Sequence, residues 1–262
     1  MIESNVSPAR SDAARVALVT GGAQGIGSAI VERLAQAGHR VLIGDVDLEA
    51  ADRLARRLNQ TGADTRPLHL DVGQPDAIRS AFASIEHHFG RCDILVNNAG
   101  IARTYPFLDY PLDHWRAVMD VNLTGPMLCG QYAARMMVDH RWGRIINIAS
   151  ISGERASAGR TAYGTSKAAL IGLTRQMAIE LAPLGITANG IAPGPVDTPL
   201  TLVLHSPLAR ENFSRAIPAG RYAVPDEIAG VAAFLASDDA SYVNGQTIAV
   251  DGGFLAAGVL EI

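Results

Sequence analysis

The strongest indication of the fold in this sequence is the glycine-rich segment Thr20-Gly21-Gly22-Ala23-Gln24-Gly25-Ile26-Gly27. It follows the apolar run Arg15-Val-Ala-Leu-Val-Thr20, which predicts a buried strand. Apolar residues at helical spacing come next, over residues 25–37, and Gly38 ends that pattern. The glycines therefore occupy a tight turn between a first strand and a first helix.

The alternation of short apolar runs and helical patterns continues to the end of the chain. The expected strands are at 41–43, 68–70, 94–96, 144–148, 185–191 and 246–250, and the expected helices are at 47–60, 75–89, 112–140, 160–182 and 225–236. Such strict alternation is typical of a parallel sheet whose two faces are both covered. We therefore predict an α/β fold: a single doubly wound domain, with a parallel sheet of about seven strands and helices on both faces. The domain spans residues 15–262, and residues 1–14 form a flexible leader.

The composition excludes several classes of protein. Of the 262 residues, 48% are hydrophobic, which is enough for one large core and excludes disorder as the main state. The net charge of −4 gives no general attraction to nucleic acid or to anionic membranes. Cys92 and Cys129 stand alone, so neither a disulfide framework nor a metal site is expected. Since no secretory signal and no run of about 18 apolar residues is visible, we expect a cytoplasmic protein without nucleic-acid or membrane partners.

The glycine loop is a candidate site for a pyrophosphate. Glycines let the backbone approach such a group, and the helix N-terminus offers free N–H groups and the positive end of its dipole. Asp45 lies 18 residues beyond Gly27, where a carboxylate accepts both ribose hydroxyls of an adenosine and repels a 2′-phosphate. This pattern predicts NAD rather than NADP. Two alternatives remain open: a glycine turn with no ligand, and Asp45 as a mere cap of the next helix.

Tyr163 and Lys167 form a candidate catalytic pair. They are four residues apart and share one face of the helix expected at 160–182. A free tyrosine has a pKa of about 10, and a fixed lysine together with an oxidised nicotinamide ring favours the phenolate. Ser150 ends a predicted strand 13 residues before Tyr163. Asn122 lies inside a helical pattern, where asparagine is unfavourable unless it serves a local bond or a site.

Together these motifs resemble the short-chain dehydrogenase/reductase family. The residues that match the order and spacing of that family are the glycine loop, Asn97-Asn98-Ala99-Gly100, Asn122, Ser150, Tyr163, Lys167 and Pro193-Gly194, over about residues 15–254. The resemblance implies a Rossmann fold and an NAD-dependent oxidoreductase that interconverts a secondary alcohol and a ketone. Tyr163 would then be the acid/base, and Lys167 would lower its pKa and bind the nicotinamide ribose. Ser150 would hold the reacting oxygen, and Asn122 would anchor a water molecule of a proton relay.

The resemblance also implies cofactor contacts. Asp71 and Val72 match contacts to the adenine, Asn98 and Gly100 match the ribose side, and Val196 and Thr198 match contacts to the nicotinamide carboxamide. The full expected set is Gly21, Gln24, Gly25, Ile26, Gly27, Asp45, Asp71, Val72, Asn98, Gly100, Tyr163, Lys167, Pro193, Gly194, Val196 and Thr198.

We expect a small-molecule substrate: a sugar, a polyol or another small hydroxylated compound. Residues 198–216 resemble the mobile substrate lid of the family. The candidate substrate residues are Arg103, Ser152, Glu154, Arg155 and His205. The apolar helical patterns at 112–137 and 168–182 match helices that pair between subunits in the family, so a homotetramer is expected.

Two other functions remain open. A 3-oxoacyl-carrier-protein reductase would carry the same motifs, but Asp45 disfavours the NADPH that this role usually uses. A catalytically silent dinucleotide-binding protein is the second, and it has no need of Asn122, Ser150, Tyr163 and Lys167 together.

Overall fold

Seven parallel strands form one sheet in the computed structural model, which describes residues 14–258. The strands are β1 (Val16–Thr20), β2 (Arg40–Asp45), β3 (Asp64–His69), β4 (Ile94–Asn97), β5 (Gly143–Ile148), β6 (Ile186–Pro193) and β7 (Thr247–Val250). Their order is β3-β2-β1-β4-β5-β6-β7, and every neighbouring pair is parallel. The predicted doubly wound α/β fold is confirmed, while the predicted leader, apart from Ala14, lies outside the described residues.

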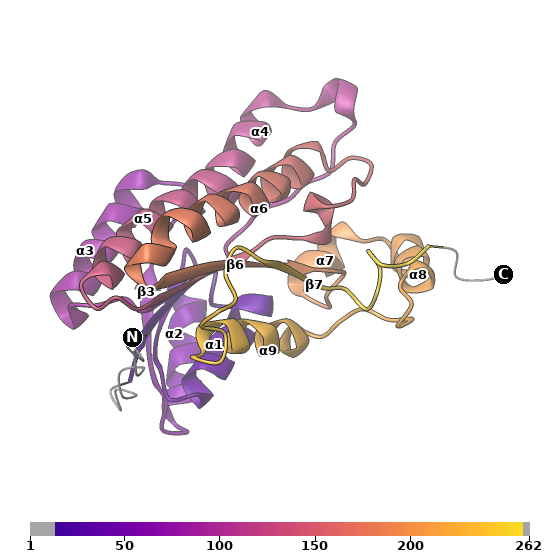
Figure 1. Ribbon diagram of the computed structural model, residues 1–262. Coiled ribbons are helices and arrows are strands. Elements are labelled where there is room, and N and C mark those ends of the chain that lie inside the picture. Colours follow the sequence, from indigo (N-terminus) through magenta and orange to yellow (C-terminus); the bar gives the residue numbers. More distant parts are fainter. Residues whose placement is uncertain (1–13, 259–262) are drawn as a thin grey trace, which may run out of the picture.

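The helices cover both faces of the sheet. They are α1 (Gly25–Gln36), α2 (Leu48–Asn59), α3 (Pro75–Phe89), α4 (Leu112–Met119), α5 (Gly125–Val138), α6 (Thr161–Leu181), α7 (Pro199–Leu204), α8 (Pro207–Ala216) and α9 (Pro225–Ala236). In Figure 1, α3, α5 and α6 lie above the sheet, and α1, α2 and α9 lie below it. Alternate residues of β1 serve the two cores, because Val19 packs with α1, α2 and α9 whereas Leu18 packs with α3 and α5.

Two predicted elements differ from the structure. The third strand begins at Asp64 rather than at residue 68, because edge strand β3 pairs on one side only and carries an exposed polar pattern. The helix expected at 112–140 is interrupted by a π-helical turn, Asp120–Thr124, between α4 and α5. Pro126 has no N–H, so it cannot donate the α-helical hydrogen bond to the Asn122 carbonyl, and the local widening is a consequence.

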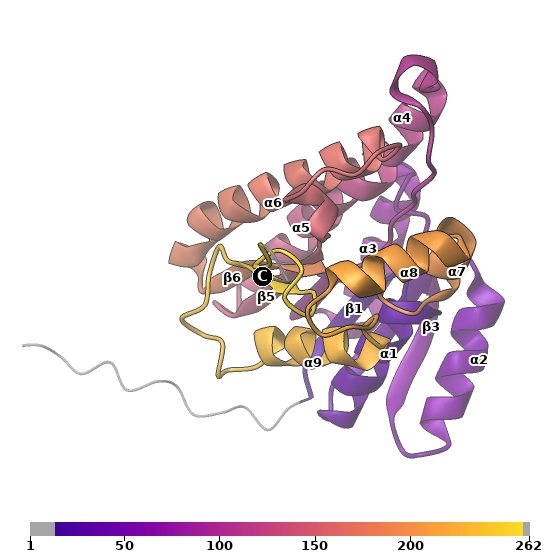
Figure 2. The same ribbon diagram turned by 90° about the vertical axis from the view of Figure 1, so that its right-hand side faces the viewer.

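The region expected to form the lid contains α7 and α8. Figure 2 shows both helices in front of the sheet, at the edge where the parallel strands end. Among residues 14–258 no helix has the length and apolar character needed to cross a bilayer. Within the same residues no three His, Cys, Asp or Glu side chains are grouped in a way that would hold a metal ion.

Candidate active site

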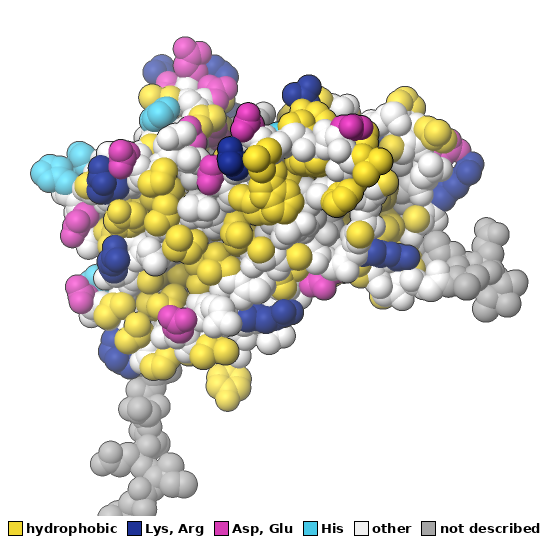
Figure 3. Space-filling view, turned by 90° about the horizontal axis from the view of Figure 1, so that it is seen from above, with side chains coloured by type: hydrophobic (Ala, Val, Ile, Leu, Met, Phe, Trp, Pro, Cys, Tyr) yellow, Lys and Arg dark blue, Asp and Glu magenta, His cyan; other side chains and the backbone are white. Residues whose placement is uncertain are grey.

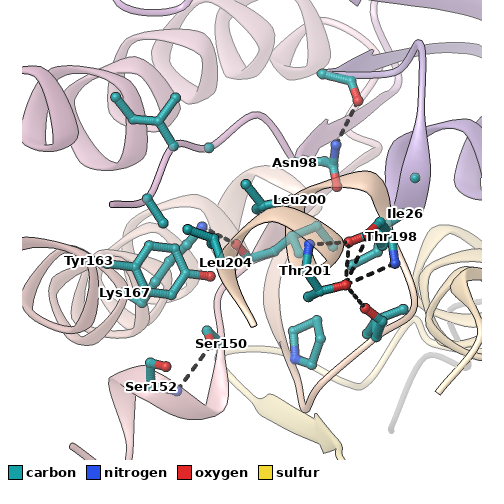
Figure 4. A pocket seen from close by; sticks show the side chains of 18 of the residues that line it. Ile26, Asn98, Ser150, Ser152, Tyr163, Lys167, Thr198, Leu200, Thr201 and Leu204 are labelled. Atoms are coloured by element: carbon teal, nitrogen blue, oxygen red, sulfur yellow. Dashed lines mark hydrogen bonds between the residues drawn. The ribbon is translucent and has the colours of Figure 1, made fainter. Parts of the chain in front are cut away.

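A cavity of about 460 Å³ lies at the carboxyl ends of the strands, a volume typical of small-ligand sites. Parallel strands bring their last residues to one edge, so loops that are distant in the sequence converge there. The sequence-predicted residues that line it are Gly21, Gln24, Gly25, Ile26, Asp45, Asp71, Val72, Asn98, Gly100, Ser150, Ser152, Arg155, Tyr163, Lys167, Pro193, Gly194, Val196, Thr198 and His205. In Figure 4, Ser150, Tyr163 and Lys167 lie together, across the cavity from Thr198 and Thr201.

The glycine loop has the geometry of a cradle. Gly21 and Gly25 have φ angles of 60° and 57°, a left-handed conformation that other residues rarely adopt. Gly27 does not line the cavity, but a Cβ there would collide with the carbonyl oxygen of Gly21. The N-terminus of α1 has no side-chain cap and no acidic residue in its first turn. Its backbone N–H groups are therefore available to an anionic group, and the loop fits a dinucleotide pyrophosphate.

Asn98 ties the glycine loop to the next loop along this edge of the sheet. Its Nδ2 atom donates to the carbonyl oxygens of Thr20, at 3.0 Å, and of Gly21, at 2.9 Å. The Thr20 hydroxyl accepts in return from the backbone N–H groups of Asn98 and Ala99, both at 3.1 Å. These bonds fix the two walls of the cavity relative to each other. The sequence pattern indicates only a cofactor contact for Asn98 and does not reveal that its side chain joins the two loops.

Asp45 is not the cap of the following helix. That cap is Asp47, whose carboxylate accepts from the backbone N–H of Ala50 at 2.9 Å. Asp45 lines the cavity and accepts from the N–H groups of Ala23 and Asp47, each at 3.0 Å. A carboxylate has about four lone-pair positions, so these two bonds hold Asp45 in place and leave acceptor capacity facing the cavity.

Ser150 and Tyr163 meet at the opposite end of the cavity. Ser150 lies two residues beyond the end of β5, and its hydroxyl accepts from the backbone N–H of Ser152 at 3.1 Å. Burial raises the pKa of the Tyr163 phenol above its ordinary value, while the nearby Ser150 hydroxyl and the charge of Arg160 lower it in part. Arg160 was not among the predicted residues. It lies three positions before Tyr163, a spacing that places two residues on one side of a helix end.

Lys167 is the only lysine of the chain and is buried in the wall of the cavity. Its Nζ atom donates to the carbonyl oxygen of Ile148 at 2.7 Å and lies 5.7 Å from the centre of the Tyr163 ring. Burial lowers the pKa of Lys167 to about 8, so the amine is still mostly charged at pH 7. The cation that the sequence predicts beside Tyr163 is therefore present, held by the end of β5.

Asn122 is fully buried within the π-helical turn. Its Oδ1 accepts from the N–H of Ile101 at 2.9 Å, and its Nδ2 donates to the carbonyl oxygen of Ile101 at 3.0 Å and to Ser166 Oγ at 3.1 Å. The side chain thus clamps the loop after β4 onto α6. The ring nitrogen of Pro126 carries no hydrogen, so the Asn122 carbonyl does not accept the usual α-helical hydrogen bond from residue 126.

The substrate end differs from the sequence prediction. Arg103 and Glu154 are exposed and do not line the cavity; the Arg103 guanidinium lies 5.5 Å from the centre of the Tyr105 ring instead. Ser152, Arg155 and His205 do line it. Further lining residues were not singled out from the sequence, among them Ser157, Arg160, Leu200, Leu204, Phe213 and Phe254. Phe254 follows β7 in the chain, and no local sequence pattern predicts that its side chain lines the cavity.

Comparisons with known proteins agree with this geometry. Residues 21–255 match the family described as "Enoyl-(Acyl carrier protein) reductase". The 3-oxoacyl-[acyl-carrier-protein] reductase of Aquifex aeolicus is 42% identical over 240 residues, which cover 91% of this chain and 96% of that protein. The cis-4-hydroxycyclohexanecarboxylate dehydrogenase of Sinomonas cyclohexanicum is 42% identical over 245 residues, covering 93% and 98%.

A solved structure is similar to this chain in both fold and sequence. The gluconate 5-dehydrogenase of Burkholderia cenocepacia, in complex with NADP and tartrate, superimposes with a TM-score of 0.90 at 40% identity and covers 93% of this chain and 96% of its own. From the fold, the convergent motifs and these relatives, the chain belongs to the short-chain dehydrogenase/reductase family, whose members are nicotinamide-dinucleotide oxidoreductases acting on alcohol and keto groups.

Proposed function

We propose that this protein is an NAD-dependent oxidoreductase that interconverts a secondary alcohol and a ketone on a small hydroxylated substrate. One observation carries this proposal. Ser150, Tyr163 and Lys167 converge at one end of the cavity, and the glycine loop lines its other end. The bound nicotinamide supplies the hydride acceptor. Side chains of this protein bind the substrate, orient it and transfer the proton.

Each catalytic side chain has a distinct task in the proposed reaction. Tyr163 takes the proton from the substrate hydroxyl during oxidation and returns it during reduction. Ser150 donates a hydrogen bond to the reacting oxygen and holds it beside Tyr163. Lys167 supplies the fixed positive charge that favours the Tyr163 phenolate, and Asn122 keeps the neighbouring loop in place and offers its carbonyl to a water molecule that relays the proton.

The preference for NAD rests on Asp45. The carboxylate is fixed by two backbone N–H groups and lines the cavity, and among residues 14–258 no Lys or Arg lines it at this end. A 2′-phosphate would meet an uncompensated negative charge there. The Burkholderia relative was solved with NADP, so Asp45 is the position at which the two proteins are to be compared.

A 3-oxoacyl-carrier-protein reductase is the second candidate function, favoured by the names of relatives such as the Aquifex and Thermotoga maritima proteins. It predicts turnover of a carrier-bound or thioester ketone with NADPH. A silent dinucleotide-binding protein predicts no turnover at all.

We also propose a homotetramer that uses the face of α5 and α6. Hydrophobic side chains gather on that face in Figure 3, and Ile179 of α6 is 72% exposed. A large apolar surface of this kind favours pairing with a second copy. Sedimentation analysis should give a tetramer for the native chain and smaller species for Ile179→Glu; a native monomer contradicts this part of the proposal.

One experiment separates the functions. Purified protein is mixed with secondary alcohols, polyols, sugars, sugar acids and a 3-oxoacyl thioester, each with oxidised and reduced NAD and NADP, and the nicotinamide absorbance is followed. We expect turnover of a small hydroxylated compound with NAD⁺. Turnover restricted to the thioester with NADPH supports the second candidate, and cofactor binding without turnover of any compound supports the silent protein.

A further inference from the structure

The substrate end of the cavity carries an excess of positive charge. Arg155, Arg160 and Lys167 line it, and the carboxylates that line the cavity among residues 14–258, Asp45 and Asp71, lie at the glycine-loop end. Most arginines in the described part of the chain form a salt bridge with Asp or Glu, as Arg210 does with Asp197. Within residues 14–258, Arg155 and Arg160 form no such salt bridge. Arg155 is exposed, whereas Arg160 is partly buried, and an unpaired guanidinium that is partly buried is costly unless a ligand pairs with it.

Arg160 is held in place by the lid. Its Nη2 atom lies 2.6 Å from Nε2 of His205, the residue that ends α7, and its guanidinium carbon lies 5.6 Å from the centre of the Tyr163 ring. His205 is buried, stacks on Phe213 at 5.1 Å between ring centres, and approaches the Tyr222 hydroxyl with Nδ1 at 2.8 Å. Arg160 is therefore fixed at the reacting end of the cavity and is not a mobile surface side chain.

The protonation state of His205 follows from these contacts. A guanidinium has only donors, so Nε2 must accept and the ring must be neutral, with its proton on Nδ1 directed at Tyr222. Burial and the charges of Arg160 and Arg210 lower the pKa of His205, which favours the same neutral form. The contact uses one nitrogen of Arg160 and neutralises none of its charge, so the guanidinium keeps the rest of its donors for a ligand.

We propose that Arg160, positioned by neutral His205 of the lid, binds a carboxylate of the substrate, so that the enzyme acts on hydroxy acids and the matching keto acids. A planar guanidinium fork matches a carboxylate, and Arg160 lines the cavity beside the Tyr163 ring, where the reacting carbon of a small acid would lie. This inference rests on the proposed alcohol–ketone function and narrows its substrate class.

The test uses matched triplets: a hydroxy acid, its primary amide and the corresponding diol, with the hydroxyl carbon at several distances from the carboxylate. Native protein, Arg160→Gln and Arg160→Lys are compared, and Arg141→Gln is the control, because Arg141 is exposed, has no carboxylate partner among residues 14–258 and lies outside the cavity and outside α5 and α6. We expect Arg160→Gln to lower kcat/KM for the acid about 100-fold, mainly through KM, with little change for the amide. Arg160→Lys should lose less, and Arg141→Gln should match the native protein.

The role of His205 is measured in the same assay. His205→Leu removes the acceptor and should raise KM for the acid with a smaller effect on kcat, whereas His205→Gln offers an amide oxygen and should restore part of the affinity. Cofactor affinity, measured by nicotinamide fluorescence, should stay native in every variant and so report an intact fold.

Three results would overturn the proposal: equal kcat/KM for acid and amide in the native protein, an equal loss for both in Arg160→Gln, or a preference for a phosphate ester over the acid. If no triplet is turned over at all, the proposed function fails, and calorimetry with malonate and malonamide decides the anion site separately. Binding of malonate alone, lost in Arg160→Gln, keeps the site; no binding of malonate removes it.

Discussion

Replacing Asp45 by Asn should change the choice between NAD and NADP. The side chain keeps its size and one acceptor oxygen but loses its charge. Two unit charges about 4 Å apart interact with about 4 kcal/mol at an effective dielectric constant of about 20. Asp45 is half-buried and opens toward solvent, so we take about half of that value, about 2 kcal/mol. The ratio of kcat/KM for NAD⁺ to that for NADP⁺ should then fall about 30-fold.

The substitution also has a cost in stability. Asp45 accepts from the N–H groups of Ala23 and Asp47, and an amide can satisfy only one of them. We expect the free energy of unfolding to fall by about 1–3 kcal/mol, measured by urea denaturation. Saturating cofactor in the kinetic assay separates this loss from the change in preference.

Asp47→Asn is the matched control for Asp45→Asn. It removes the same charge two residues away, at a position that caps α2 and does not line the cavity. Asn caps a helix about as well as Asp, so the free energy of unfolding should fall by only about 0.5 kcal/mol, from the lost charge at the helix N-terminus, while the cofactor ratio stays native. An unchanged ratio in Asp45→Asn, or an equal change in Asp47→Asn, refutes the account of Asp45.

Three further predictions concern the cradle and the reacting end. Gly27→Ala should weaken NAD binding by about 100-fold or more, since the new Cβ would collide with the Gly21 carbonyl oxygen. Native affinity in a calorimetric titration would contradict this prediction, because it would show that the loop can move to accommodate the methyl group. Asn122→Ala should lower the free energy of unfolding by about 3 kcal/mol, because three buried hydrogen bonds are lost; a loss below about 1 kcal/mol in urea denaturation contradicts the clamp. Burial lowers the pKa of Lys167 to about 8, and only the neutral amine reacts, so its acetylation rate should rise with pH and level off above about pH 8. Peptide mass spectrometry can follow this single lysine, and a rate that still rises steeply at about pH 10, the ordinary lysine range, contradicts the assigned pKa.

Much of the fold and of the catalytic end could be predicted because both depend on local patterns. Apolar runs that end at glycine or at polar residues define parallel strands, and parallel strands bring their carboxyl ends together. Ser150 lies just beyond β5 and Tyr163, 13 residues later, lies in the first turn of α6, so the segment between them stays at this edge of the sheet and both side chains reach the cavity. The four-residue spacing of Tyr163 and Lys167 needed only a helix, which α6 provides.

The remaining features depend on tertiary contacts that leave no local pattern. Pro126 is visible in the sequence, but the π-helical turn at Asp120–Thr124 also depends on the clamp of Asn122 on Ile101, a residue 21 positions away. Arg103 and Arg160 look alike in the sequence, as loop arginines near the site. Arg103 lies over the Tyr105 ring and Arg160 contacts His205, and only the packed structure distinguishes the two arginines.

The central claim is that Tyr163 exchanges the proton with the reacting oxygen, and Tyr163→Phe tests it most directly. Nicotinamide absorbance is followed with the best substrate of the panel, and cofactor affinity is measured on the same sample by fluorescence. General acid–base catalysis contributes about 10²–10⁴ in rate. We predict a loss of kcat by about 10³ or more with native cofactor affinity. Turnover within about tenfold of the native rate would contradict the claim, because a loss that small falls short of this contribution.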